Sequence, residues 1–297
     1  MDVFRVLLIG LGNIAMGYDL GHRDTTWTHV GAITKHSNFK IIAAIDPNVD
    51  THQPFSRLSS AKVFREIDEF LESEHGKVDL VVIASPTAKH LEHYVKIKAL
   101  EPRLVLMEKP LLAANQDLDM FMDEARHGPN IMVNLFRLCQ SQINLKLHEL
   151  ANTGLCRIHV RYSQQLHHNA IHFISLIMRH FGSLKSQEDL GLKNYSDIHL
   201  RFEKADVLLQ PAMGDLDDNS MIVYSAQGSL YYLNGGRIFF FVDAQHFQHH
   251  YDQAEFQHHM LKVYEHCHEV INGKSDDSLE LAFSGHNILM EYEQYEA

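Results

Sequence analysis

The first half of the chain alternates between short, compact apolar runs and stretches in which apolar residues recur at helical spacing. The first run stops at Gly10, as a strand buried on both faces of a sheet does. His90, Tyr94, Ile97 and Leu100 are spaced as one face of a helix. The apolar runs occupy residues 4–9, 41–45, 80–84, 104–107 and 131–133. Strands that alternate with helices predict βαβ units and a doubly wound parallel sheet.

The pattern changes after about residue 120. Further helices are predicted at residues 118–125, 141–152, 170–181, 253–271 and 281–292. Strand-like runs separated by glycine and Asp/Asn turns occupy residues 157–164, 198–202, 207–209, 221–225, 229–233 and 237–242. Consecutive strands with short turns favour an antiparallel sheet. We therefore predict a parallel-sheet domain at residues 1–120 and an α+β domain with an open, mostly antiparallel sheet at residues 121–297.

Charge and composition narrow the functional classes. The chain of 297 residues has 26 basic and 38 acidic residues, a formal charge of -12, which argues against a nucleic-acid or anionic-membrane partner. No apolar run approaches the roughly 20 residues that cross a bilayer. The three cysteines are scattered and lack metal-binding spacing, which is typical of free thiols in a reducing compartment. We therefore expect a cytoplasmic, globular protein.

A glycine motif follows the first predicted strand. Residues 10–15 read Gly-Leu-Gly-Asn-Ile-Ala, a G-x-G-x-x-A sequence. Gly10 permits a tight turn, Gly12 lets the backbone approach a pyrophosphate, and the small Ala15 lets the next helix pack closely. Amides at the start of that helix then hold the phosphates. The motif predicts a Rossmann domain that binds a dinucleotide.

An acidic residue strengthens this prediction. Asp46 ends the second predicted strand, where its carboxylate would accept hydrogen bonds from an adenosine ribose. It follows Gly12 by 34 positions, and the excess over the usual spacing of about 20 indicates an insertion at residues 17–26, before a helix at 27–35. A simple turn after a strand is the alternative interpretation of Asp46. The charge of Asp46 favours NAD over NADP, but Arg57 and His52 nearby leave NADP open.

Two further segments carry a family resemblance. Residues 84–90 read Ala-Ser-Pro-Thr-Ala-Lys-His after one strand, and Glu108-Lys109-Pro110 ends the next. With the glycine turn, they resemble the glucose-fructose oxidoreductase / inositol dehydrogenase / MocA family of NAD(P)-dependent enzymes. Residues 134–137 (Asn-Leu-Phe-Arg) and 154–160 look like the family's entry into its second domain.

The resemblance implies a second domain whose open sheet covers the nicotinamide and often builds an oligomer interface, so we expect a homo-oligomer, with dimer and tetramer both open. It implies that Lys109 lies near the reacting carbon, where its ammonium polarises a carbonyl or binds an alcohol. Pro110 commonly fixes a turn there, sometimes with a cis bond. A surface lysine at a strand end is the alternative. The cofactor-binding candidates are Gly10, Gly12, Asn13, Ile14, Asp46, Ser85, Pro86, His90 and Glu108.

The match departs from the family in the second domain. The family has an acid or amide residue four positions before a histidine at the start of a helix, and His172 falls on the histidine position. Here His168 replaces the acid or amide, and Ser175 stands where an acid is frequent. Histidine titrates near neutrality, so His172, with His168 on the same helix face, is the acid/base candidate. Asn134 and Arg137 are candidates to bind the substrate.

The histidines near the C-terminal end of the chain are candidates for a metal site. Residues 246–268 include several at spacings that could bind zinc, but no cysteine pair or His-Glu-x-x-His pattern accompanies them. We interpret them as a solvated surface and predict no metal.

The leading hypothesis is hydride transfer between nicotinamide and a sugar, cyclitol or nucleotide-sugar-like polyol. A catalytically silent dinucleotide-binding sensor or assembly protein is the alternative, because His168 and Ser175 depart from the family pattern. A third hypothesis keeps the enzyme but changes the chemistry, to reduction of an imine or a conjugated double bond.

Overall fold

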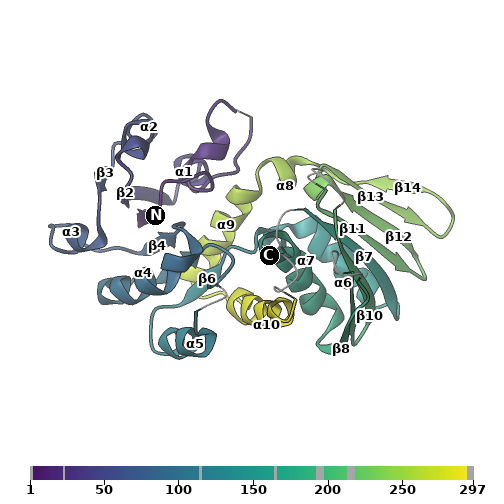
Figure 1. Cartoon of the computed structure of the whole chain (residues 1–297). Coiled ribbons are helices and arrows are strands. Elements are labelled where there is room, and N and C mark those ends of the chain that lie inside the picture. The colour runs from purple at the N-terminus through teal and green to yellow at the C-terminus, as the bar shows by residue number, and fades with distance from the viewer. Residues whose placement is uncertain are drawn as a thin grey trace. The chain divides into compact units, whose positions relative to one another are not determined.

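The computed structural model describes residues 3–22, 24–113, 116–163, 166–191, 197–212 and 218–292. The chain forms two compact units (Figure 1). The first contains residues 1–134 and 257–279, and the second contains residues 135–256 and 280–297. The chain therefore passes between the units three times.

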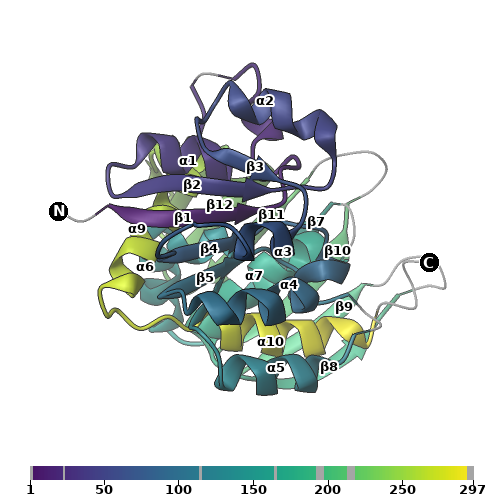
Figure 2. The same ribbon diagram turned by 90° about the vertical axis from the view of Figure 1, so that its left-hand side faces the viewer.

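The first unit is built on a six-stranded parallel sheet with strand order β3-β2-β1-β4-β5-β6 (Figure 2). Its strands are β1 (Phe4–Ile9), β2 (Phe39–Ile45), β3 (Lys62–Phe64), β4 (Leu80–Ile83), β5 (Leu104–Met107) and β6 (Ile131–Val133). All residues of β4 and β5 are buried, because a parallel sheet is covered on both faces. The order reverses direction between β1 and β4, which is the place where doubly wound sheets bind their ligands. The predicted Rossmann topology is confirmed.

Helices cover both faces of this sheet. The helices from the first part of the chain are α1 (His29–Lys35), α2 (His52–Ser56), α3 (Ile67–Leu71), α4 (His90–Ile97) and α5 (Leu118–Arg126). Short 3-10 turns are η1 (Gly17–Asp19), η2 (Val49–Thr51), η3 (Thr87–Lys89) and η4 (Lys98–Leu100). α4 buries Tyr94 and Ile97, so the predicted apolar face of this helix is confirmed.

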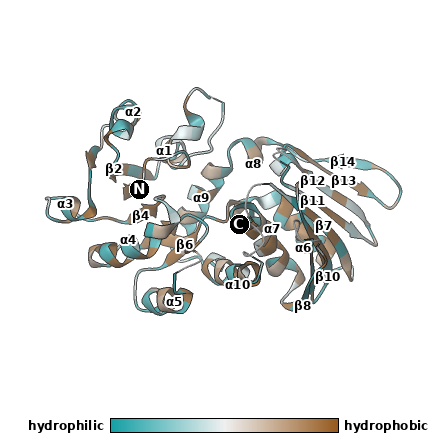
Figure 3. Ribbon diagram, viewed as in Figure 1, coloured by the Kyte–Doolittle hydropathy of each residue, from teal (hydrophilic) through white to brown (hydrophobic). Residues whose placement is uncertain are grey.

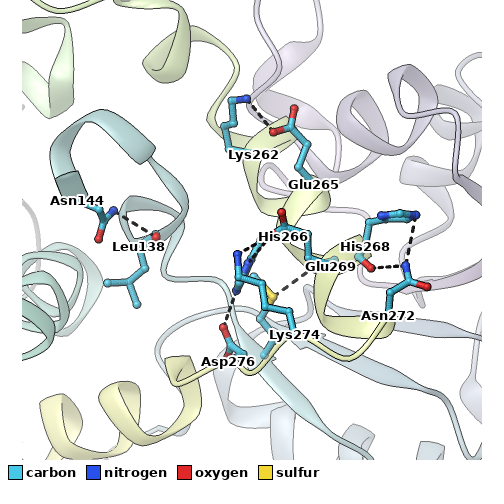
Figure 4. A network of polar contacts seen from close by, with 12 residues as sticks. Leu138, Asn144, Lys262, Glu265, His266, His268, Glu269, Asn272, Lys274 and Asp276 are labelled. Atoms are coloured by element: carbon cyan, nitrogen blue, oxygen red, sulfur yellow. Dashed lines mark hydrogen bonds and ion pairs between the residues drawn. The ribbon is translucent and has the colours of Figure 1, made fainter.

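A helix from much later in the chain completes this unit. α9 (His259–Ile271) packs against α1 and β5 and buries Val263, Tyr264 and Cys267. The end of α9 is held by polar contacts (Figure 4): His266 Nε2 lies 2.9 Å from a carboxylate oxygen of Asp276. Asp276 also accepts a hydrogen bond from the amide of Ser278.

The second unit is built on an eight-stranded sheet with strand order β14-β13-β12-β11-β7-β10-β9-β8. Its strands are β7 (Cys156–Tyr162), β8 (Leu184–Asp189), β9 (Ile198–Phe202), β10 (Ala205–Pro211), β11 (Ser220–Ser225), β12 (Gly228–Leu233), β13 (Ile238–Asp243) and β14 (Gln248–His250). Among the described strands of this second sheet only the β7–β10 pair is parallel, so the expectation of an open, mostly antiparallel sheet is confirmed. Apolar residues run along the strands of both sheets (brown in Figure 3).

The helices and 3-10 turns of this part of the chain are η5 (Phe136–Cys139), α6 (Ser141–Ala151), α7 (Leu166–Phe181), η6 (Asn234–Gly236), α8 (Ala254–Gln257) and α10 (Ser278–Met290). α7 packs on β7 and β10 and buries most of its length. It begins four residues earlier than the predicted helix at 170–181. No helix in the described part of the chain is long and apolar enough to span a bilayer.

The division of the chain differs from the boundary that the sequence pattern placed near residue 120. Residues 121–134 stay with the first unit because β6 pairs with β5. Residues 257–279 return to it because α9 covers the face of the sheet at β5. The βαβ repeats thus continue past residue 120, through α5 to β6, and the first unit continues with them.

Candidate active site

The predicted cofactor residues of the first unit lie at one edge of its sheet. Gly10, Asp46, Glu108 and Asn134 directly follow β1, β2, β5 and β6, and Ser85 follows β4 by one residue. The amides of the four residues that directly follow a strand still donate to the neighbouring strand; for example, Asn134 N donates to Met107 O at 2.8 Å. Because all six strands are parallel, these residues meet at the carboxyl edge, where α/β proteins bind ligands.

The glycine turn needs its glycines for two different reasons. Gly10 has a φ of 93°, and a Cβ there would lie 2.6 Å from the backbone of Ala84. Nothing lies within 4 Å of a Cβ built on Gly12. Gly10 is thus required by the protein's own packing, whereas the space beside Gly12 is free for a ligand.

The helix after the glycine turn is interrupted by an excursion of the chain at residues 17–28. The turn begins with Met16 N donating to Gly12 O at 3.0 Å. The amide of His29 then donates to Ile14 O at 3.2 Å, so α1 resumes the interrupted hydrogen-bonding pattern. This is the insertion that the long Gly12-to-Asp46 spacing predicted. Asn13 and Ile14 lie before the excursion, in the turn that directly follows Gly12.

Asp19 organises the described residues of this excursion. Its carboxylate accepts hydrogen bonds from the amides of Trp27 and Thr28 and from the hydroxyls of Thr25 and Thr28, at 2.6–3.1 Å. Burial raises the pKa of Asp19, but these donors outweigh it and hold the pKa below its usual range. Asp19 was not among the predicted site residues, because its donors at residues 25–28 lie six to nine positions later in the sequence.

Asp46 fixes the glycine turn as well as ending β2. One carboxylate oxygen accepts from the amide of Leu11 at 2.6 Å, and the other accepts from Asn48 at 2.8 Å. The residue is 9% exposed. The structure therefore contains both features considered for Asp46, a turn after the strand and a carboxylate at the cofactor edge.

The Ser-Pro-x-x-x-His segment turns from β4 into α4. The hydroxyl of Ser85 lies 2.9 Å from Nδ1 of His93. His90 is buried, with Nε2 3.0 Å from Ser85 O and Nδ1 3.1 Å from Leu111 O. Burial lowers the pKa of His90, so a neutral ring donates to one of these carbonyls at a time. His90 therefore joins the loops that follow β4 and β5.

Glu108 and Lys109 end β5 in different surroundings. Glu108 is buried and binds His29 Nε2 at 3.0 Å and Asn134 Nδ2 at 2.5 Å. Lys109 is half-buried, and the bond between Lys109 and Pro110 is cis. Burial raises the pKa of Glu108, but His29, Asn134 and the charge of Lys109 together lower it, so Glu108 is a carboxylate at neutral pH. A buried anion thus directly precedes the candidate catalytic cation.

These residues fit a bound dinucleotide. The open space at Gly12 can admit a pyrophosphate, and Asp46 can accept from a ribose with its remaining lone pairs. Oδ1 of Asn134 is buried and has no hydrogen-bond partner within the described ranges. A buried acceptor of this kind costs stability unless something donates to it, and a ligand amide can do so.

The remaining candidates lie in the second unit. His168 and His172 both lie on α7, four positions apart, with His168 half-buried and His172 1% exposed. The ring of His172 contacts Phe136 edge-on at 4.6 Å between centroids. Ser175 is buried and donates to Ile171 O within the helix. Ser175 thus stands at the position where an acid is frequent in the family pattern.

Arg137 lies among aromatic rings. It is 3% exposed, and its guanidinium carbon lies 4.7 Å from the ring of Phe136, 4.4 Å from Phe173 and 5.8 Å from Tyr232. Asn134 belongs to the first unit and Arg137 to the second, on either side of one chain crossing. Their predicted role in substrate binding remains a prediction.

Histidines of the described segments make ordinary polar contacts. His249 pairs with Asp243 at 3.0 Å, and His266 pairs with Asp276 at 2.9 Å. In the described residues, no group of three His, Cys, Asp or Glu side chains could hold a metal ion.

Comparison with known proteins bears on the fold and the family. Residues 4–135 match the model of an oxidoreductase family with an NAD-binding Rossmann fold. No curated protein matches the chain. Similar solved structures include a dehydrogenase from Chromobacterium violaceum, at a TM-score of 0.78 and 14% identity, with 98% of this chain and 94% of that chain covered.

Two further structures contain ligands. The WlbA dehydrogenase from Bordetella pertussis, in complex with NADH and UDP-GlcNAcA, has a TM-score of 0.74 and 15% identity, covering 99% of this chain and 96% of its own. KijD10, a 3-ketoreductase from Actinomadura kijaniata in complex with NADP and TDP-benzene, has a TM-score of 0.72 and 14% identity. The match covers 96% of this chain and 95% of KijD10. At such identities these likenesses show the fold. Residues 4–135 therefore resemble the NAD-binding Rossmann domain of the glucose-fructose oxidoreductase / inositol dehydrogenase / MocA family, and the likeness to the solved structures extends their fold over nearly the whole chain.

Proposed function

We propose that this oxidoreductase transfers hydride between a nicotinamide and a CH–OH or C=O carbon of a sugar-like substrate, with a nucleotide-linked sugar as the favoured class. The observation that carries the proposal is the position of Lys109, which follows β5 at the sheet edge that also bears the open Gly12 turn. A cation there is suited to an oxygen that gains negative charge during reduction.

Each residue has a defined task in this proposal. Gly12 and the first turn at Asn13 and Ile14 receive the pyrophosphate, and Asp46 accepts from the adenosine ribose. When bound, the nicotinamide supplies or accepts the hydride. Lys109 binds the substrate oxygen and stabilises its charge, and His172, with His168, relays the hydroxyl proton.

The loops after β4 and β5 act around the cofactor. Ser85 and Pro86 line the edge of the sheet that receives the cofactor. His90 contacts the carbonyls of Ser85 and Leu111, so its role is to hold the two loops together and not to touch the cofactor. Glu108 supports Lys109 in the same indirect way. Asn134 Oδ1 accepts from the bound ligand, and Arg137 is proposed to bind a substrate polar group in the second unit.

The substrate class is supported by the complexes of similar folds. WlbA is bound to a nucleotide-linked sugar acid, and KijD10 is a ketoreductase bound to a thymidine nucleotide derivative. A free sugar or cyclitol is the second class to test. NAD is favoured over NADP because the buried carboxylate of Asp46 would repel a 2′-phosphate.

We also propose that the outer face of the second sheet is covered by another copy of the chain. Outward side chains of β11, β12 and β13 are apolar and incompletely buried; they include Ile222, Tyr231, Leu233, Ile238 and Phe240. Tyr231 and Phe240 stack at 4.7 Å. A hollow of about 700 Å³ on the same face is lined by Arg157, His159 and Tyr224 among others. Exposed apolar faces of this kind mark association sites. Tyr231→Glu, assayed by analytical ultracentrifugation, should give monomers; a monomeric wild type contradicts this part of the proposal.

The function is tested by titrating the purified protein with NADH and NADPH, followed by turnover assays at 340 nm. The panel contains UDP-linked hexuronates, UDP- and TDP-linked hexoses, free sugars and inositols. NADH binding with turnover of one class supports the proposal. Failure to bind either dinucleotide overturns it. Binding without turnover, with a cellular phenotype that Lys109→Ala leaves unchanged, favours the silent sensor.

A further inference from the structure

A chain of four buried polar side chains runs behind the cofactor edge of the first unit. Tyr264 Oη lies 3.0 Å from His29 Nδ1, and His29 Nε2 lies 3.0 Å from Glu108 Oε1. Asn134 Nδ2 donates to the same oxygen of Glu108. His29 and Tyr264 are fully buried, and Asn134 is 2% exposed. These groups come from α1, α9 and the ends of β5 and β6.

The hydrogen bond between His29 and Glu108 has a fixed direction. The donors around Glu108 keep it ionised, so its carboxylate accepts, and Nε2 of His29 carries the hydrogen and donates. Burial raises the pKa of Tyr264 well above its usual range, so its hydroxyl keeps its proton and shares a hydrogen bond with Nδ1 of His29. His29 therefore links Tyr264 on α9 to the carboxylate at the end of β5.

This chain of hydrogen bonds fixes the surroundings of Lys109. Glu108 directly precedes Lys109, and its side chain is anchored to two other elements by His29 and Asn134. On the other side of Lys109, Leu111 O faces His90 at 3.1 Å. The backbone of Lys109 is thus held on both sides. The charge of Lys109 also contributes to lowering the pKa of Glu108, so the ammonium and the anchored carboxylate influence each other electrostatically.

A buried carboxylate is costly to maintain unless donors surround it, so a purely structural position is better filled by apolar residues. We propose that His29 is a positioning residue that, through Glu108, fixes the place and the charge of the Lys109 ammonium. This inference rests on the proposed function, in which Lys109 acts on the substrate oxygen.

Two substitutions of His29 separate its two hydrogen bonds. Gln can put an amide donor near the position of Nε2 and so keep the bond to Glu108, whereas Asn reaches only the position of Nδ1. We expect His29→Asn to lower kcat by about tenfold or more with little change in the Kd for NADH, and His29→Gln to restore most of the loss. Glu108→Gln should resemble His29→Asn. Equal kcat losses in His29→Asn and His29→Gln would indicate a packing role and overturn the proposal.

A second measurement does not depend on turnover. The ¹³Cε signal of Lys109 in protein with labelled lysine, identified by its loss in Lys109→Ala, reports when the ammonium loses its proton. Removing the fixed carboxylate in Glu108→Gln should lower that pKa by about one unit, and His29→Asn should lower it in the same direction. Unchanged titration in both variants overturns the proposal even if the enzyme's substrate has not been found.

The outcomes distinguish this inference from the proposed function. If Lys109→Ala abolishes turnover while His29→Asn leaves kcat and the Lys109 titration unchanged, the function stands and the positioning role falls. If Lys109→Ala leaves turnover intact, the proposed function falls, and the titration still decides whether His29 sets the charge. Should His29→Asn not fold, Tyr264→Phe, which removes one hydroxyl, is expected to lower kcat and the Lys109 pKa in the same sense but less.

Discussion

The carboxylate of Asp46 accepts a hydrogen bond from the amide of Leu11 at 2.6 Å, between the two glycines of the cofactor turn. The acid at the end of β2 and the turn at the end of β1 are therefore one structural unit. Loss of the carboxylate should disturb the pyrophosphate site as well as the ribose site.

For this reason Asp46→Ala should weaken NADH binding by at least tenfold and lower the free energy of unfolding by about 1–3 kcal/mol, since a buried amide loses its acceptor. Fluorescence titration and thermal unfolding measure the two effects. Asp50→Asn, an exposed acid four residues away, is the matched control. Unchanged affinity in Asp46→Ala would show that its carboxylate does not contribute to the cofactor site.

The two glycines of the turn should respond differently to alanine. Gly10→Ala places a methyl group 2.6 Å from the Ala84 backbone at a positive φ and should destabilise the first unit by several kcal/mol. Gly12→Ala meets no protein atom within 4 Å, so its melting temperature should stay near that of the wild type while NADH binding falls. Tight NADH binding by Gly12→Ala would place the pyrophosphate elsewhere.

Lys109→Ala should reduce kcat by at least a hundredfold and leave the Kd for NADH within about threefold, because the ammonium acts on charge that develops in the transition state. Steady-state kinetics and cofactor titration check the two values. Lys96→Ala, which removes a surface lysine paired with Asp68, is the control. A parallel rise in KM with unchanged kcat would instead assign Lys109 to substrate binding.

His167 should stay neutral until the solution is strongly acidic, because burial lowers its pKa to about 4. Its folded-state pKa is below the unfolded value of about 6.5, so the unfolded chain binds more protons between those values. Stability should therefore fall as the pH drops from about 6.5 to about 4. NMR titration of the His167 ring tests this, with exposed His250 as an internal reference. A His167 midpoint near 6.5 contradicts it.

Much of the first unit could be predicted because its central strands are almost entirely buried. β4 and β5 read as unbroken apolar runs and β1 is interrupted only by Arg5, and the residues that follow them had to meet at one edge once the strands were parallel. The glycine turn and Asp46 were predicted from their places at strand ends, and Glu108 from the resemblance of its Glu-Lys-Pro segment. The spacing to Asp46 even predicted the excursion.

Edge strands escaped the sequence analysis for the opposite reason. β8 has only β9 beside it and exposes Lys185 and Ser186, and all three residues of β14 are exposed. Such strands are held by backbone hydrogen bonds to one neighbour, so no apolar alternation identifies them. β3 has only three residues and was missed as well.

Long-range partners were also beyond the sequence analysis. Nothing near His29 in the sequence indicates that its ring meets Glu108, 79 positions later, or that Tyr264 approaches from α9. A histidine inside the apolar face of a predicted helix was the available sign, but it does not identify the partner.

The return of residues 257–279 to the first unit limits how the protein can be divided. A fragment ending at Asn134 would lack α9 and Tyr264, so part of the sheet face at β5 would be left bare and the ring of His29 would lose a partner. Neither half corresponds to one uninterrupted stretch of coding sequence. A recombination event that replaces the second unit and keeps the first must therefore exchange residues 135–256 as an insert with two breakpoints, so that α9 stays in the chain. The alternative is a circular permutation that moves the α9 sequence next to the rest of the first unit.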